Sequence, residues 1–173
     1  MTTTRDLLHA YDTQLRTDAE TPSALAVSRL GPLRLVTFQG GRGFITYQDL
    51  DGADATTIRD WVGQALDHFR RDPAIERVEW KTRGHDIAPG LHESLVTAGF
   101  VSEEAESIML GPLSGLVADV AVPDGVTLRS VTAETDVRAM CAMQDEAFGE
   151  PVSRHMADAV VSRLARGDGM ELW

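Results

Sequence analysis

One stretch of the chain, residues 75–110, constrains the fold more than any other part. Its apolar pattern predicts a strand, a short helix and a second strand, over residues 76–82, 90–98 and 105–110. An amphipathic helix is predicted just before it, over residues 56–71. A strand, a helix and a further strand form a crossover unit, so the strand preceding that helix and strand 76–82 should be parallel neighbours.

The ends of the short helix carry recognisable signals. Pro89 suits the first turn, where its missing N–H has no helical partner to lose. Gly99 suits the left-handed position after the helix, and Phe100 then falls where it packs back on Leu95. The sequence therefore predicts a helix that ends sharply in a Gly-Phe pair.

The residues before this stretch predict a helix, a meander of three strands and a long helix. The helix covers residues 4–16, with Thr3 or Thr4 and Asp6 at its N-terminus. The strands are expected over residues 24–30, 33–38 and 44–50, with turns at Gly31-Pro32 and residues 40–43. Residues 49–54 form a loop, and Asp54 or Thr56 caps the long helix.

After a segment rich in Gly, Pro and small residues, a second unit is predicted. It begins with a strand over residues 126–131 and a helix opened by Thr132 or Glu134. The apolar side chains expected to face inward on this helix are Val137, Met140, Cys141, Ala147 and Phe148. A further helix begins at Pro151 and stops at Gly167, and residues 170–173 begin a strand.

Charge and composition narrow the classes of function. The chain has 27 acidic and 16 basic side chains and a formal net charge of −11, which disfavours nucleic acid as a partner. It has no apolar run of membrane-spanning length and no signal-peptide pattern at the N-terminus. Its single cysteine, Cys141, cannot form an internal disulfide. We therefore expect a cytoplasmic protein without a membrane or nucleic-acid partner.

The Ala98-Gly99-Phe100 helix ending, followed by a strand finishing in Met109-Leu110, resembles the last third of the GNAT (Gcn5-related N-acetyltransferase) fold. The segment from Val126 onward is similar to the start of a GNAT domain. Glu79-Trp80-Lys81, with His85-Asp86 after it, resembles bacterial GNAT proteins in which a degenerate N-terminal half precedes the catalytic half.

The resemblance implies an α/β fold with a mixed sheet, of the GNAT-like (acyl-CoA N-acyltransferase) type. It implies a degenerate GNAT-like N-terminal domain over residues 1–112, a linker over residues 113–125 and the incomplete beginning of a C-terminal GNAT domain over residues 126–173. It also implies acyl transfer from acetyl-CoA to the amine of a small molecule or peptide, without a metal ion.

The family binds the CoA pyrophosphate with an R/Q-x-x-G-x-G/A loop between a strand and a helix. At that place this chain has three carboxylates, Asp49, Asp51 and Asp54, around a single glycine, Gly52. Residues 166–171 match the loop only partly and are better explained as a helix stop. The chain alone is therefore expected to bind acetyl-CoA weakly and to be inactive.

Substrate-binding residues follow only from the resemblance. Glu146 and Phe148 occupy the region that lines the amine-acceptor site in GNAT enzymes, and a carboxylate there could orient an ammonium group. The sequence assigns neither a catalytic base nor a cofactor-binding residue. An alternative is a non-catalytic binding or dimerisation module on a GNAT scaffold, which would form a homodimer.

Other polar and reactive residues favour structural roles. Residues 40–43 suit a hairpin turn better than a phosphate cradle. His85, His92 and Asp86 suggest surface positions rather than a metal site. Cys141 lies on an apolar stripe and is expected to be buried rather than nucleophilic. The Trp80-Lys81 pair is expected to pack at a seam between the two units, with ligand contact as the alternative.

Overall fold

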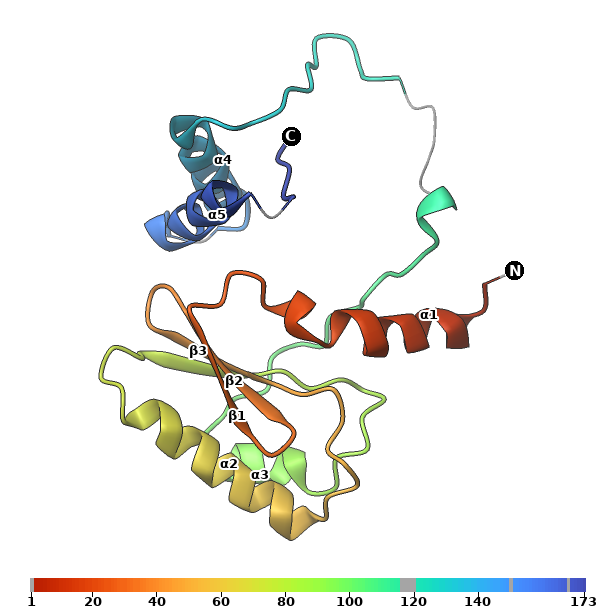
Figure 1. Cartoon of the computed structure of the whole chain (residues 1–173), viewed down its shortest axis with the longest axis vertical. Helices are drawn as coiled ribbons and strands as arrows, with labels where there is room; N and C mark the ends of the chain where they lie inside the picture. The colour runs from red at the N-terminus through yellow and green to blue at the C-terminus, as the bar shows by residue number, and fades with distance from the viewer. Residues whose placement is uncertain (1, 116–120, 150, 168) are drawn as a thin grey trace. The chain divides into compact units, whose positions relative to one another are not determined.

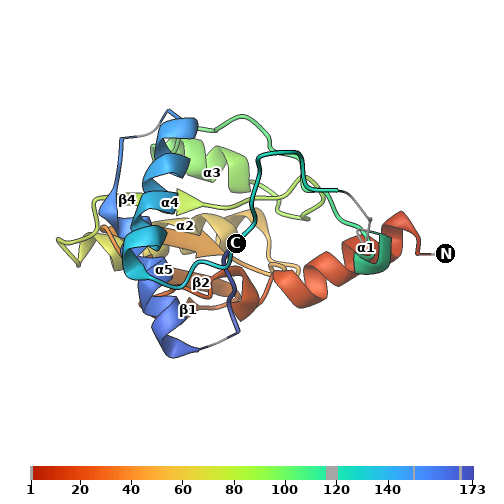
Figure 2. The same cartoon turned by 90° about the horizontal axis from the view of Figure 1, so that it is seen from above.

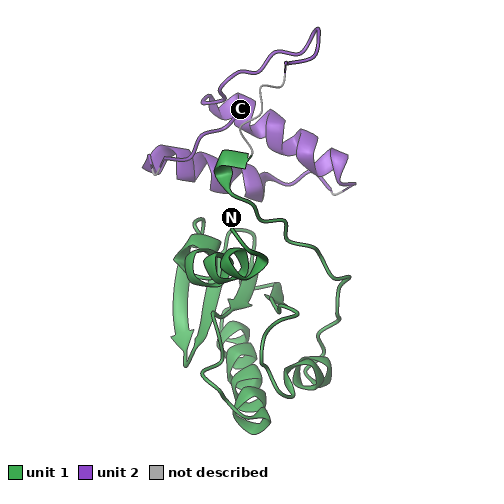
Figure 3. Cartoon of the chain, turned by 90° about the vertical axis from the view of Figure 1, so that its right-hand side faces the viewer, with its two compact units in different colours: residues 1–116 green, residues 117–173 purple. Residues whose placement is uncertain are grey.

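The computed structural model describes residues 2–115, 121–149, 151–167 and 169–173. The chain divides into two compact units, Met1–Leu116 (unit 1) and Val117–Trp173 (unit 2), which Figure 3 colours separately. Residues 116–120 of the predicted linker lie outside the described residues. Within the described part of the chain, no helix is long and apolar enough to cross a membrane.

The N-terminal helix is present but changes its hydrogen-bonding pattern part-way. Helix α1 spans Thr4–Ala10, a π-helical turn (η1) follows over Tyr11–Leu15, and a 3-10 turn (η2) covers Asp18–Glu20. The predicted cap is confirmed: the Asp6 N–H donates to Thr3 Oγ1 at 3.2 Å, and the Thr3 N–H donates to the Asp6 carboxylate at 2.8 Å. Figures 1 and 2 both show α1 projecting beyond the sheet, and none of its residues is buried.

Unit 1 is built on a four-stranded mixed sheet in the order β1-β2-β3-β4 (Figure 1). The strands span Ala26–Leu30, Leu33–Phe38, Arg42–Thr46 and Arg77–Trp80. β1, β2 and β3 pair antiparallel, and β3 and β4 pair parallel. The predicted hairpin, the second turn and the parallel neighbours are all confirmed.

Strand β3 is shorter than predicted, because it ends at Thr46 rather than at Leu50. The backbone carbonyl of Tyr47 accepts hydrogen bonds from the side chain of Arg16 instead of from a neighbouring strand. Tyr47 and Leu50 are nevertheless buried. Their apolar side chains made this segment resemble a continuous strand.

Helix α2 (Ala55–Arg70) covers one face of the sheet. Its buried side chains are Ile58, Val62, Ala65 and Phe69, spaced as one helical face, as predicted. They form a core with Leu35 and Ile45 of the sheet and with Leu91 and Leu95 of helix α3 (Leu91–Thr97). A Cβ on Gly43 would lie 2.8 Å from the Phe69 ring, so only glycine lets that ring pack against β3.

Helix α3 ends as the sequence predicts. Gly99 has φ 94°, the Phe100 N–H donates to the Leu95 carbonyl, and the Gly99 N–H donates to the Val96 carbonyl, both at 3.0 Å. The start of the helix differs from the prediction. It begins at Leu91 after the left-handed Gly90, so Pro89 precedes the helix instead of lying in its first turn.

The strand predicted over residues 105–110 is wrong. Residues 101–112 carry no regular secondary structure and are exposed, with Val101 and Met109 at 89% and 93% exposure. A strand requires a hydrogen-bonded partner, and β4 pairs only with β3 among the described residues. A short 3-10 turn (η3) follows at Leu113–Gly115.

Unit 2 contains two helices, α4 (Glu134–Ala147) and α5 (Arg154–Arg166). The inward positions of Val137 and Cys141 are confirmed, and both side chains pack in a small core with Val131 and Ala157. The inward positions of Ala147 and Phe148 are wrong, because both residues are exposed, Phe148 to 77%.

The ends of the elements in unit 2 differ from the predictions in two respects. Helix α5 begins at Arg154, capped by the Ser153 hydroxyl, so Pro151 lies before it. Its stop at Gly167 is confirmed, since this residue is left-handed with φ 64°. Residues 126–131 and 170–173 form no strands, although the Val131 N–H donates to the Leu172 carbonyl at 2.9 Å. A single backbone hydrogen bond is not enough to define a pair of strands.

Candidate functional site

The loop between β3 and α2 is acidic and is held by hydrogen bonds between its own residues. Asp51 and Gly52 both have positive φ, 53° and 69°, and the Asp51 N–H donates to the Asp49 carboxylate at 2.7 Å. Asp54 caps α2 by accepting a hydrogen bond from the Thr57 N–H at 2.8 Å. The predicted cap is thereby confirmed. Two backbone donors of this segment are therefore already bound to carboxylates of the chain.

The carboxylates of this loop differ in their protonation behaviour. Hydrogen bonds from the backbone and side chain of Thr57 lower the pKa of Asp54, which favours its charged form at the helix N-terminus. A hydrogen bond with Asp49, together with its negative charge, raises the pKa of Asp51. The raised pKa favours the protonated form of Asp51 beside Asp49, and a nearby cation would favour the charged form of both carboxylates.

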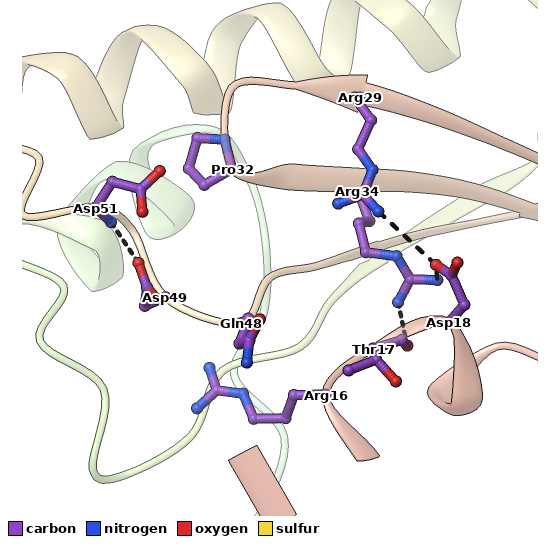
Figure 4. Close-up of a pocket in the computed structure, with 9 residues that line it drawn as sticks. All are labelled: Arg16, Thr17, Asp18, Arg29, Pro32, Arg34, Gln48, Asp49 and Asp51. Carbon is purple, nitrogen blue, oxygen red and sulfur yellow. Dashed lines mark hydrogen bonds and ion pairs between the residues drawn. The ribbon is translucent and has the colours of Figure 1, made fainter. Parts of the chain in front are cut away.

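A pocket of about 320 Å³ opens beside this loop (Figure 4). Three arginines and three aspartates contribute to its lining, together with Thr17, Pro32 and Gln48. These charged residues are Arg16, Arg29, Arg34, Asp18, Asp49 and Asp51. Figure 4 shows Asp49 and Asp51 on one side, and Arg29, Arg34 and Asp18 on the opposite side. The formal charges of the lining cancel, but the carboxylate pair is separated from the arginines.

Arg16 lines the pocket and is held by several contacts with the protein. Its side chain is 2% exposed and forms ion pairs with Asp12 at 2.9 Å and Asp86 at 2.8 Å. Its Nε and Nη2 also donate to the Tyr47 carbonyl, at 3.3 and 3.1 Å. Because its donors are bound within the protein, Arg16 holds the segments around the pocket together and is not available to bind an anionic ligand.

Arg34 lies on the other face of the sheet from the main core. It donates to the Thr17 carbonyl and the Thr21 hydroxyl, both at 2.6 Å, and pairs with Asp18 at 3.0 Å. Its side chain is 3% exposed, and its Nε has no hydrogen-bond partner among the described residues. Arg34 therefore fixes the turn at residues 17–21 to strand β2.

Arg83 also connects the N-terminal segment to the sheet. It pairs with Glu20 and donates to the Thr46 hydroxyl at 3.0 Å and to the Tyr11 hydroxyl at 3.3 Å. The Thr46 hydroxyl in turn donates to Glu20 at 2.7 Å. These contacts tie residues 11–20 to the sheet.

The segment after β4 differs from its predicted role. Asp86 was expected at the surface, but its side chain is 7% exposed because it pairs with Arg16. His85 Nε2 lies 2.9 Å from the Asp12 carboxylate. No group of three or more His, Cys, Asp or Glu side chains placed to hold a metal is found in the described ranges.

Trp80 also differs from its prediction. Its side chain belongs to the main core of unit 1 and contacts the Phe100 ring edge-on, with ring centroids 6.4 Å apart. The expectation that Trp80 packs at a seam between units is therefore wrong. The core of unit 1 accounts for its burial.

The residues proposed from the family resemblance lie elsewhere, at the C-terminal end of α4. Glu146 and Phe148 are both exposed there, and they lie outside the pocket of unit 1. Cys141 of the same helix is buried, as predicted, and desolvation by burial raises the pKa of its thiol. A raised pKa makes this thiol a poor nucleophile.

No family model, curated protein or solved structure matches this chain. Its function is therefore inferred from the fold and from the residues described above.

Proposed function

We propose that this chain is a homologue of the GNAT N-acetyltransferases, in which unit 1 is a degenerate, non-catalytic half and unit 2 is the opening of a catalytic half. The order of elements in unit 1 is the observation that supports this proposal most. A helix, three antiparallel strands, a helix, a parallel strand and a short helix follow one another, and the short helix ends in Gly99-Phe100.

The loop before α2 supports the degenerate character of unit 1. A pyrophosphate held at a helix N-terminus needs free backbone N–H groups and no nearby negative charge. Here the Asp54 carboxylate already accepts from the Thr57 N–H, and Asp49 and Asp51 lie in the loop that leads to the helix. Both features work against binding of acetyl-CoA by unit 1.

The two consecutive helices of unit 2 support its assignment as an opening of the family's fold. In this proposal an acyl group passes from acetyl-CoA to an amine of a small molecule or peptide. The cofactor loop would be supplied outside residues 1–173. Glu146 and Phe148 are accessible at the end of α4, where Glu146 could orient the incoming ammonium group.

Titration of the full 173-residue chain with acetyl-CoA in a calorimeter tests the first part of this proposal. We expect no saturable binding below about 1 mM, because the loop before α2 is acidic and two backbone N–H groups of this segment are already bound to carboxylates. The triple variant Asp49→Asn, Asp51→Asn, Asp54→Ser removes the negative charge without adding the glycines of the family loop. This variant is expected to remain a weak binder.

Micromolar binding by the wild-type chain would contradict the degenerate assignment. The coding sequence after Trp173 tests the second part. It is expected to encode a strand, an R/Q-x-x-G-x-G/A loop and a helix, and an extended chain carrying them is expected to bind acetyl-CoA. Absence of that loop would remove the enzyme hypothesis.

A non-catalytic dimerisation module is the second candidate function. Exposed apolar side chains favour it, since large ones are found at Val101, Met109 and Leu113 in unit 1 and at Phe148 in unit 2. Size-exclusion chromatography with light scattering distinguishes the candidates. A monodisperse dimer whose mass does not change with dilution supports the module, whereas a monomer or a polydisperse sample supports the incomplete enzyme.

A further inference from the structure

The pocket of unit 1 has features of a ligand site that acyl transfer does not require. Its volume of about 320 Å³ is near the lower end of the range for small-molecule sites. It contains equal numbers of arginines and aspartates, and the Asp49–Asp51 pair faces the arginine side across the pocket (Figure 4). Such a lining best matches a ligand that is neutral overall but carries one charge at each end.

The arginine side has donors available for an anionic group. Arg29 is 62% exposed, and its ion pair with Asp18 is 3.8 Å long, which exceeds hydrogen-bond length. Arg34 beside it is fixed by Thr17 and Thr21 and pairs with Asp18 at 3.0 Å, so the two arginines and Asp18 leave one net positive charge on this side. A carboxylate that meets the Arg29 guanidinium could accept two parallel hydrogen bonds.

The opposite side suits a cationic group. Asp49 and Asp51 lie on the same side of the pocket, where the Asp51 N–H donates to the Asp49 carboxylate at 2.7 Å, and a bound ammonium group could pair with both carboxylates. Figure 4 shows the Pro32 ring between the acidic side and Arg29, where it offers an apolar surface to a short aliphatic chain.

We propose that this pocket binds a small aliphatic zwitterion with its charges at opposite ends, an ω-amino acid whose carboxylate meets Arg29 beside Arg34 and whose ammonium group meets Asp49 and Asp51. A phosphate or other multiply charged anion would be repelled by the three aspartates. A polyamine would be repelled by Arg29 and Arg34. This site is independent of the proposed acyltransferase function.

Nuclear magnetic resonance titration of the full chain with γ-aminobutyrate and ε-aminohexanoate tests the proposal. We expect saturable shifts of the backbone amide signals of Arg29, Asp49 and Asp51 with at least one of the two compounds. Hexanoate and hexylamine each carry only one of the two charges. At equal concentrations they are expected to bind about fivefold to tenfold more weakly, because each loses one charged contact.

Two variants with exposed substitutions locate the ends of the ligand. Arg29→Gln and the double variant Asp49→Asn, Asp51→Asn are each expected to weaken zwitterion binding about fivefold to tenfold. Arg5→Gln and Asp60→Asn change the same charges at exposed positions outside the pocket, and they are expected to bind like the wild type. The proposal is overturned by any of three results: no saturable shift, equal binding of hexanoate or hexylamine, or unchanged binding by the pocket variants.

Discussion

Replacing Arg16 with methionine is expected to lower the free energy of unfolding of unit 1 by about 3–5 kcal/mol, since it leaves a buried carboxylate without its cation. Asp86 is 7% exposed and loses its partner at 2.8 Å, and the Tyr47 carbonyl loses both of its side-chain donors. Methionine keeps much of the apolar stem, so lost packing contributes little. Urea unfolding followed by tryptophan fluorescence measures the change.

Two further substitutions make the Arg16 measurement specific. A Trp173→Phe background removes the one tryptophan of unit 2, so that the fluorescence comes from Trp61 and Trp80 of unit 1. Arg70→Met is the matched control, because Arg70 is 67% exposed and its loss is expected to cost no more than about 0.5 kcal/mol. A loss in Arg16→Met as small as in this control would show that the buried network contributes little stability.

The effect of Arg16→Met is expected to shrink in acid. Burial raises the pKa of Asp12, but hydrogen bonds and charge interactions with His85 and Arg16 outweigh it, and the net pKa lies below its ordinary value of 3.8. A lowered pKa in the folded state stabilises the protein above the unfolded-state pKa, and this contribution is lost as the pH falls through the folded-state pKa. The difference between wild type and variant should therefore be full near neutral pH and smaller below 3.8. A constant difference would exclude Asp12 from the stabilising network.

Replacing Phe69 with alanine is expected to destabilise unit 1 by about 3–5 kcal/mol, through lost burial and the cavity left behind. The Phe69 ring is 3% exposed and lies against the backbone of β3 at Gly43, where no Cβ fills the space. The surrounding sheet cannot easily collapse into that volume. The same fluorescence assay, in the Trp173→Phe background, gives the magnitude.

Gln64→Ala is the control for Phe69→Ala, because Gln64 is exposed on the same helix. Alanine is a good helix former, so this change is expected to leave stability within about 0.5 kcal/mol of the parent. If Phe69→Ala also stays within that range, the packing of α2 on the sheet contributes far less stability than its burial indicates.

The sequence alone predicted the elements whose signals are local. Helix α2 was recognisable from the spacing of Ile58, Val62 and Phe69, and its cap from Asp54, because a helix and its cap are formed by residues a few positions apart. The Gly99-Phe100 ending was equally readable, since its two hydrogen bonds close within six residues. The β1–β2 hairpin followed from its turn at Gly31-Pro32.

The predictions failed where an element depends on a distant partner. Residues 105–110 have a strand-like pattern, but a strand exists only if another segment completes its hydrogen bonds, and among the described residues β4 supplies none to it. Phe148 was assigned inward from helical spacing, although the core of unit 2 that the structure describes does not extend to it. A local pattern shows which secondary structure or orientation a segment is able to adopt. Contacts with distant parts of the chain decide whether it adopts them.

The sequence by itself determined the α/β character of unit 1, the order of its helices and strands from α1 to α3, and the acidic loop at residues 49–54. Only the tertiary structure decided the candidate site. Arg16 meets Tyr47 across 31 positions, and Arg83 meets Glu20 across 63. No local pattern marks these pairs, because their partners come together only when residues 11–20 pack across the sheet. The same packing places Arg29 and Arg34 opposite Asp49 and Asp51.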